Sequence, residues 1–303
     1  MTTTLISSAH RNLPAIEADG WLDKALFPFT SRYLSLGDCT MHYLDEGEGP
    51  LLLMLAGTPM WSFMYRELIA ELREAYRCVV VDLPGMGLSR AALHRGKAFS
   101  VAADWLHRLV DKLRLSDITL VVHATSGPVA LDMAARQPER IRRLVISNTF
   151  AWPLDRQPRL ARIVRVVSSR LFGLLNTRLN LLPRITARAG RRAGRFSEAE
   201  RRAILGPFHQ HAARQHLQNY LRSLRTERDW LAGLEQRLGS LRDKPALLAY
   251  GRHDNGYRAG FLQRWQQLLP NHRVEVLDEA GHFAFEDDPQ QMTHLIAQFA
   301  QSA

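Results

Sequence analysis

An acid and a histidine follow two successive strand-like segments near the C-terminal end of the chain. Asp254 comes shortly after the apolar segment 246–250, and His282 comes shortly after the segment 273–277. A carboxylate that orients an imidazole makes it a competent general base, able to take a proton from water or from a substrate. The pattern therefore predicts acid–base chemistry by an Asp254–His282 dyad.

The segments around these residues alternate between strands and helices, which predicts an α/β fold with a mostly parallel sheet flanked by helices. Ligands bind such sheets at the carboxyl ends of the strands. The small-residue turn 123–127 (HATSG) also follows a strand there, so we expect it to meet the dyad. The expected strands are a hairpin of 32–36 and 40–44, then 51–55, 78–81, 118–122, 144–147, 246–250 and 273–277.

The alternation stops between the two halves of this pattern. Residues 151–239 show helical spacing and no convincing strand, so we expect a core of 1–150 and 240–303 with a helical cap, or lid, inserted between them. Between Arg156 and Arg228 there are 17 arginines and three acids, a net charge of +14 in a chain whose total is +10. This basic segment either forms an ordinary solvated face or creates an electrostatic field that draws an anionic substrate or an acidic partner protein.

Several motifs resemble the α/β-hydrolase family, and within it the haloalkane dehalogenase and epoxide hydrolase branch. Residues 57–66 (GTPMWSFMYR) resemble the branch's His-Gly-Asn-Pro-x-Trp-Ser-Phe-x-Tyr-Arg segment, and 81–89 (VDLPGMGLS) resemble its Asp-Leu-Pro-Gly-x-Gly-x-Ser turn. Asp254 and Gly-His-Phe at 281–283 match its acid and histidine. The resemblance covers residues 33–299 and implies an eight-stranded sheet with a helical cap after the sixth strand.

The resemblance also implies a nucleophile that this chain lacks. In this branch the elbow reads His-Asp-Trp-Gly-Gly, and its Asp attacks carbon to form an ester that histidine-activated water cleaves. Ser126 and Gly127 fit the small residues needed after the nucleophile, which places Ala124 at the nucleophile position. Alanine has no lone pair to donate. Thr125 or Ser126 is a poor substitute, because either would place Pro128 in a turn that needs small residues.

Substrate contacts of the branch are also altered. Thr58 and Thr125 stand where the branch has halide-binding Asn and Trp, and we expect both threonines to offer backbone N–H groups to an oxyanion hole. Trp61 and Trp152 are the expected substrate-binding aromatics. Epoxide hydrolases use two cap tyrosines, but the cap here has only Tyr220 before residue 235. Apolar residues expected under the cap, or packed between its helices, are Trp152, Leu171, Phe172, Leu174, Phe208, Leu217 and Trp230.

Three functions remain open. The first is a dehalogenase-like hydrolase, acting at carbon of a small apolar or anionic substrate, whose nucleophile is missing through a natural or engineered change. The second is an enzyme that uses the dyad alone as a general base, as a lyase, an isomerase or an activator of water. The third is a non-catalytic protein that binds a ligand in the old pocket.

Composition narrows the remaining possibilities. The chain has 303 residues, 46% of them hydrophobic, and only two cysteines, which excludes disordered and disulfide-scaffold proteins. We expect Cys39 and Cys78 to be reduced, and Met1–Ala15 to carry no secretory signal, so a cytoplasmic location is expected. No membrane span, cofactor or nucleic-acid partner is expected. His209, His211 and His216 do not share one helical face, so no metal is expected either.

Overall fold

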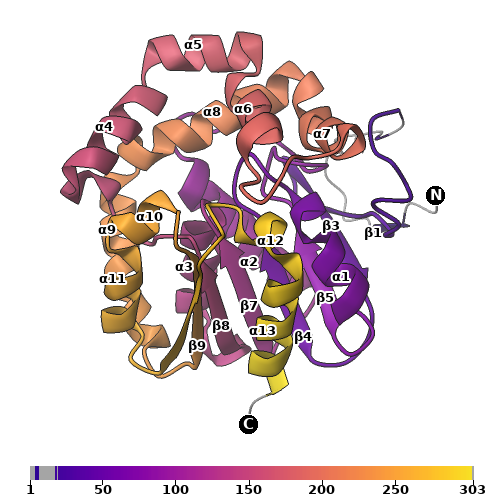
Figure 1. Ribbon diagram of the computed structural model, residues 1–303, viewed down its shortest axis with the longest axis vertical. Helices are drawn as coiled ribbons and strands as arrows, with labels where there is room; N and C mark the ends of the chain where they lie inside the picture. The colour runs from indigo at the N-terminus through magenta and orange to yellow at the C-terminus, as the bar shows by residue number, and fades with distance from the viewer. Residues whose placement is uncertain (1–3, 7–17, 19, 302–303) are drawn as a thin grey trace.

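The computed structural model describes residues 4–6, 18 and 20–301 (Figure 1). A ten-stranded sheet forms its centre, in the order β1-β2-β3-β5-β4-β7-β8-β9-β10, with β6 paired to β3. The strands are β1 Thr4–Ile6, β2 Arg32–Ser35, β3 Cys39–Glu46, β4 Leu51–Leu55, β5 Arg77–Val81, β6 Arg90–Ala91, β7 Ile118–His123, β8 Ile141–Ser147, β9 Ala246–Gly251 and β10 His272–Leu277.

The sheet is mostly parallel, as the sequence pattern predicts. Only β3 runs antiparallel to its neighbours β2, β5 and β6. The resemblance predicts eight strands, and the two additional ones are β1 and β6, which are three and two residues long. Segments this short carry too little alternation to be recognised in a sequence. Because β9 and β10 are parallel neighbours, the loops that follow them emerge side by side.

The sheet separates two hydrophobic cores, which explains the continuous apolar runs of its central strands. On β4, Leu51, Leu53 and Leu55 enter one core, whereas Leu52 and Met54 enter the other. A strand buried on both faces needs an apolar residue at every position. The helices that cover the two faces are α2 Ala98–Lys112, α3 Ser126–Arg136 and α11 Phe261–Leu268 on one side, and α1 Arg66–Leu72, α12 Ala284–Asp287 and α13 Pro289–Gln301 on the other.

Helices alone fill the segment between β8 and β9 in the described chain. Figure 1 shows α4 to α8 lying across one end of the sheet. The last of the inserted helices, α9, packs against α3 at the side of the main domain, so the limits of 151–239 for a cap stay a prediction. The bounds are α4 Pro158–Val167, α5 Arg170–Leu179, α6 Leu181–Ala189, α7 Glu198–Leu205, α8 His211–Thr226 and α9 Arg228–Arg237.

A buried ion cluster ties the inserted helices to the main domain. Arg66 at the start of α1 contacts Glu286 Oε1 of α12 at 2.7 Å and Glu200 Oε1 of α7 at 2.6 Å. Arg191, which follows α6, contacts the second oxygen of Glu286 at 2.8 Å. Glu286 stands four residues after His282, so this cluster anchors the segment that carries the histidine.

Removing the charge of Glu286 is expected to destabilise the protein. Glu286→Gln leaves two guanidinium groups facing a neutral amide, and breaking a buried pair costs about 3 kcal/mol. Glu67→Gln removes a half-exposed carboxylate 3.3 Å from the same Arg66 and should cost less than about 0.5 kcal/mol. Urea unfolding measures both. Equal losses in the two variants would contradict the anchoring role of Glu286.

Two further expectations concern the cysteines and the membrane. Cys39 and Cys78 are buried and unpaired, and burial raises the pKa of Cys78 to about 12, so its thiol stays protonated. Among the residues that the structure describes, no helix is long and apolar enough to cross a bilayer. The expectation about a secretory signal falls on Met1–Ala15, most of which lies outside the described residues.

Candidate active site

The loops after β9 and β10 bring the predicted acid and base together. Asp254 Oδ2 lies 2.6 Å from Nδ1 of His282. The other carboxylate oxygen of Asp254 accepts backbone N–H bonds from Gly256 at 2.7 Å and Tyr257 at 3.1 Å, which caps the short helix α10, Asn255–Arg258. One carboxylate therefore orients the imidazole and fixes its own loop.

The two members of the dyad differ in exposure. The Asp254 side chain is 4% exposed, whereas the His282 side chain is 42% exposed. Burial alone would raise the pKa of Asp254, but the charge and hydrogen bond of His282 and the two N–H donors lower it below its ordinary value. The carboxylate thus stays charged at neutral pH and can keep its hydrogen bond to Nδ1 of the imidazole.

Ala124 stands at the tip of a sharp bend between β7 and α3. Its φ is +50°, a region that L-residues other than Asn and Asp rarely adopt. The bend is crowded, because a Cβ built on Gly57 would lie 2.6 Å from Ala124 Cβ and one built on Gly127 would lie 1.9 Å from Thr149 Oγ1. Glycine at 57 and 127 is therefore a steric requirement of this turn.

The hydroxyls next to Ala124 are engaged away from the imidazole. Thr125 Oγ1 accepts the backbone N–H of Thr58 at 2.7 Å and donates to Thr58 Oγ1 at 3.1 Å. Ser126 Oγ is fully buried, accepts the backbone N–H of His123 at 3.0 Å and donates to the carbonyl of Leu55 at 2.6 Å. The expectation that Thr58 offers its N–H to a substrate thus needs correction, because Thr125 already accepts that hydrogen bond.

Two residues for which the sequence pattern predicts no role hold the dyad in place. Asn148, at φ +46° after β8, donates to the carbonyls of Gly281 at 3.0 Å and His282 at 2.7 Å and accepts from the N–H of Gly251 at 3.0 Å. His123 Nε2 donates to the same carbonyl of His282 at 2.7 Å. The feature of the sequence that could have identified them is their position, because His123 ends β7 and Asn148 directly follows β8.

The buried His123 predicts a loss of stability in acid. Burial, aided by the proximity of His282, lowers the pKa of His123 to about 3, so it folds as a neutral ring. The unfolded chain takes up this proton below about pH 6.5. Between these two pH values, stability falls with falling pH by about 1.4 kcal/mol per unit from this group. Unfolding free energies at pH 7 and in mild acid measure the slope.

The variant His123→Asn keeps a side-chain N–H and removes the titration, so its stability should fall less steeply in the same window. His294→Asn, which alters an exposed histidine of α13, should keep the slope of the parent protein. If His123→Asn also kept that slope, the folded ring would be taking up its proton near neutral pH.

The two tryptophans expected to bind substrate are packed into the protein. Trp61 is 1% exposed, and its Nε1 donates to the carbonyl of Ala203 in α7 at 3.1 Å. Trp152 is 3% exposed, lies against Trp265 with ring centroids 4.9 Å apart, and borders a cavity of about 350 Å³ between 152–160 and α11. Both rings fix the inserted helices to the main domain.

Other predicted residues of the insertion are divided between the core and the surface. Phe208 and Leu217 are fully buried, but Leu171 and Leu174 are 69% and 47% exposed, so their placement under the cap is wrong. The hydroxyl of the buried Tyr220 donates to the carbonyl of Pro84 at 3.3 Å. The amphipathic pattern is the same for an inner and an outer face, and only the tertiary packing distinguishes them.

The histidines of the insertion do not converge. His216 is buried in α8, its Nε2 contacts the carbonyl of Ala91 at 3.0 Å, and burial lowers its pKa. His209 and His211 are exposed. No group of three or more histidine, cysteine or acidic side chains in the described ranges could hold a metal ion.

The fold agrees with comparisons to known proteins. The sequence model of the alpha/beta hydrolase fold matches residues 50–289, and the chain belongs to that family. Within the family, it resembles haloalkane dehalogenases. It is 31% identical over 278 residues to haloalkane dehalogenase 2 of Mycobacterium bovis, covering 90% of this chain and 96% of the relative.

Another relative carries a different activity in its name. A cis-3-alkyl-4-alkyloxetan-2-one decarboxylase of Shewanella oneidensis is 31% identical over 280 residues, covering 89% of this chain and 88% of the relative. Among solved structures, the haloalkane dehalogenase DbeA of Bradyrhizobium elkani matches with a TM-score of 0.79 at 21% identity, covering 90% of this chain and 97% of that one. The structural match supports the fold alone.

Proposed function

We propose that this chain is a dehalogenase-type α/β-hydrolase that lacks its covalent nucleophile. The observation that carries the proposal is Ala124 at φ +50°, at the tip of the strand-to-helix bend where the family resemblance places an attacking carboxylate. The Asp254–His282 pair is retained with a 2.6 Å hydrogen bond. A methyl group cannot attack carbon, so the family's ester intermediate cannot form at residue 124.

The remaining residues support a base without a nucleophile. Asp254 holds Nδ1 of His282, so Nε2 is the nitrogen that accepts a proton. Asn148 and His123 fix the backbone carbonyl of His282 and so set the direction of the ring. The substrate class that fits the relatives' names is a small, largely apolar molecule with an electrophilic carbon, such as a haloalkane or an oxetanone.

The intact dyad favours one second candidate. His282 and Asp254 can act alone as a general base toward water or toward a C–H bond, as in a lyase or an isomerase, with a contribution of about 10²–10⁴-fold. A third possible function is ligand binding in the same pocket, without nucleophilic attack and without proton transfer.

Turnover assays of the parent chain and of two variants test the proposal. The proposal predicts no turnover of bromoalkanes, epoxides or oxetanones by the parent, with or without His282. Turnover by the parent that His282→Ala abolishes would overturn it in favour of the dyad alone. Turnover that survives His282→Ala but is lost in Thr125→Val would overturn it in favour of a neighbouring hydroxyl nucleophile.

We further propose that the inserted helices act as a cap over this site. Arg192 and Arg195 are exposed after α6, and a basic cap would draw anionic substrates toward the site. A substrate affinity that did not weaken with added salt would contradict the electrostatic role of the cap.

We also propose that the protein resides in the cytoplasm. The two buried, unpaired cysteines support a reducing compartment.

A further inference from the structure

The exposed surface of the first three inserted helices is rich in apolar side chains. Every large hydrophobic side chain that is exposed in the described part of the protein lies on α4, α5 or α6. Exposure reaches 69% at Leu171 and 58% at Val166. Contiguous apolar patches on a surface mark places where another molecule or a membrane binds. The seven residues are Ile163, Val166, Leu171, Leu174, Leu175, Leu179 and Ile185.

The same three helices carry only positive charge. Residues 158–189 contain seven arginines, all exposed, and neither an acid nor a lysine. Exposed apolar and exposed cationic side chains are therefore interleaved along the same three helices, and we call the exposed surface of α4, α5 and α6 the α4–α6 face. The arginines are Arg159, Arg162, Arg165, Arg170, Arg178, Arg184 and Arg188.

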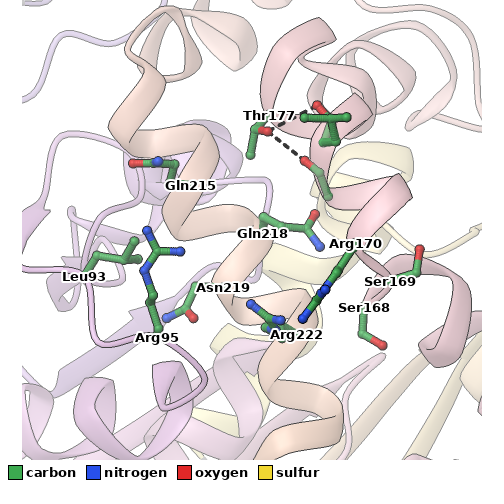
Figure 2. A pocket seen from close by; sticks show the side chains of 12 residues that line it. Leu93, Arg95, Ser168, Ser169, Arg170, Thr177, Gln215, Gln218, Asn219 and Arg222 are labelled. Carbon is green, nitrogen blue, oxygen red and sulfur yellow. Dashed lines mark hydrogen bonds between the residues drawn. The ribbon is translucent and has the colours of Figure 1, made fainter.

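A cavity of about 270 Å³ opens beside this face, between α5, α8 and the loop that contains Arg95. Figure 2 shows Arg95 on one side and Arg170 and Arg222 on the other, with Gln218 and Asn219 of α8 between them. No ion pair joins any of these three arginines to a carboxylate within the described ranges. Leu174 borders the cavity and also belongs to the apolar patch, so the two features are continuous.

We propose that the α4–α6 face docks on an anionic phospholipid bilayer, with a lipid phosphate in the Arg95–Arg170–Arg222 cavity and the exposed leucines among the acyl chains. Guanidinium groups bind phosphate oxygens in a bidentate manner, and the cavity offers three of them. Amphipathic helices with arginine and leucine on one surface lie in the interface of anionic membranes.

The charge of the α4–α6 face favours a bilayer over two other partners, a second copy of the chain and an acidic protein. A second copy of the chain would bring seven more arginines against the first seven, so self-association through this face is disfavoured. An acidic protein would satisfy the arginines but leaves the apolar side chains without a reason to be exposed between them. A bilayer satisfies both, because negative headgroups and hydrocarbon lie within one layer.

Co-sedimentation of the full chain with vesicles tests the proposal. We expect binding to vesicles of equal parts phosphatidylglycerol and phosphatidylcholine, and on the order of tenfold weaker binding to phosphatidylcholine alone. Leu171→Ser/Leu175→Ser should lower the affinity about tenfold, because both side chains leave the hydrocarbon. Arg108→Ala/Lys112→Ala, which removes two exposed charges from α2, should bind like the parent.

Inorganic phosphate isolates the contribution of the cavity. We expect calorimetric titration to detect phosphate binding to the parent and to Arg162→Ala/Arg178→Ala, but not to Arg170→Ala/Arg222→Ala. The two pairs remove equal charge from the protein, and only the second pair borders the cavity. Loss of phosphate binding in both pairs would refute a specific cavity.

Three results would overturn membrane docking. They are equal binding to neutral and anionic vesicles, binding to poly-glutamate without binding to vesicles, and a dimer on size-exclusion chromatography that Leu171→Ser/Leu175→Ser dissociates. Each variant is compared with the parent by thermal unfolding, so that a folding defect is recognised separately.

Discussion

The substitution Ala124→Asp is expected to give this protein turnover of bromoalkanes, by about 10²-fold or more over the parent. The new carboxylate would attack the carbon that bears the halogen, a C–O bond would form, and bromide would leave with the bonding electrons. Water deprotonated by His282 would then attack the ester carbonyl, release the alcohol and restore the carboxylate. Bromide release measured over time gives the rate.

The elbow is suited to this change. Asp and Asn are enriched several-fold at positive φ, so we expect Asp at φ +50° to cost no more conformational free energy than alanine does. The control Ala124→Asn has nearly the same shape and no carboxylate, and it should stay as inactive as the parent. Equal rates in the Asp and Asn variants, both well folded, would place the chemistry somewhere other than residue 124.

A second large effect is expected from the acid of the dyad. In the Ala124→Asp background, Asp254→Asn should lower kcat by about 10³–10⁴-fold, the loss seen when an orienting carboxylate of a catalytic triad becomes an amide. The asparagine oxygen can still accept the N–H bonds of Gly256 and Tyr257, so the cap of α10 is preserved. The loss then reports on the imidazole that Asp254 orients.

Asp278→Asn is the matched control for this variant. Asp278 is an exposed acid that pairs with Arg252 in the neighbouring loop, and its amide should leave kcat within about twofold of the Ala124→Asp protein. An Asp254→Asn protein that kept the kcat of the Ala124→Asp protein would remove Asp254 from the mechanism.

The sequence pattern could predict the parts of this protein that depend on local composition. The run 51–55 is apolar at every position because each residue enters one of two cores, and such runs identify buried strands. Asp254 and His282 could be paired in advance because they follow two strands that proved to be parallel neighbours. Local pattern and topology were sufficient for both.

Contacts between distant segments could not be predicted in this way. The hydrogen bond from Thr58 N–H to Thr125 joins residues 67 positions apart, and it depends on how closely two loops pack. Asn148 and His123 support His282 from 134 and 159 positions away in the sequence. Leu171 and Leu174 show the same limit, because helical periodicity identifies an apolar face without saying what covers it.

The most direct test of the proposal that residue 124 occupies the nucleophile position is peptide mass spectrometry of Ala124→Asp/His282→Ala after incubation with a bromoalkane. Without the histidine, the ester should accumulate, and the peptide that contains residue 124 should gain the mass of the alkyl group minus one hydrogen. The same treatment of His282→Ala with Ala124 intact should leave this peptide unchanged. An adduct on Thr125 or Ser126, in either protein, would contradict the placement of the nucleophile at residue 124.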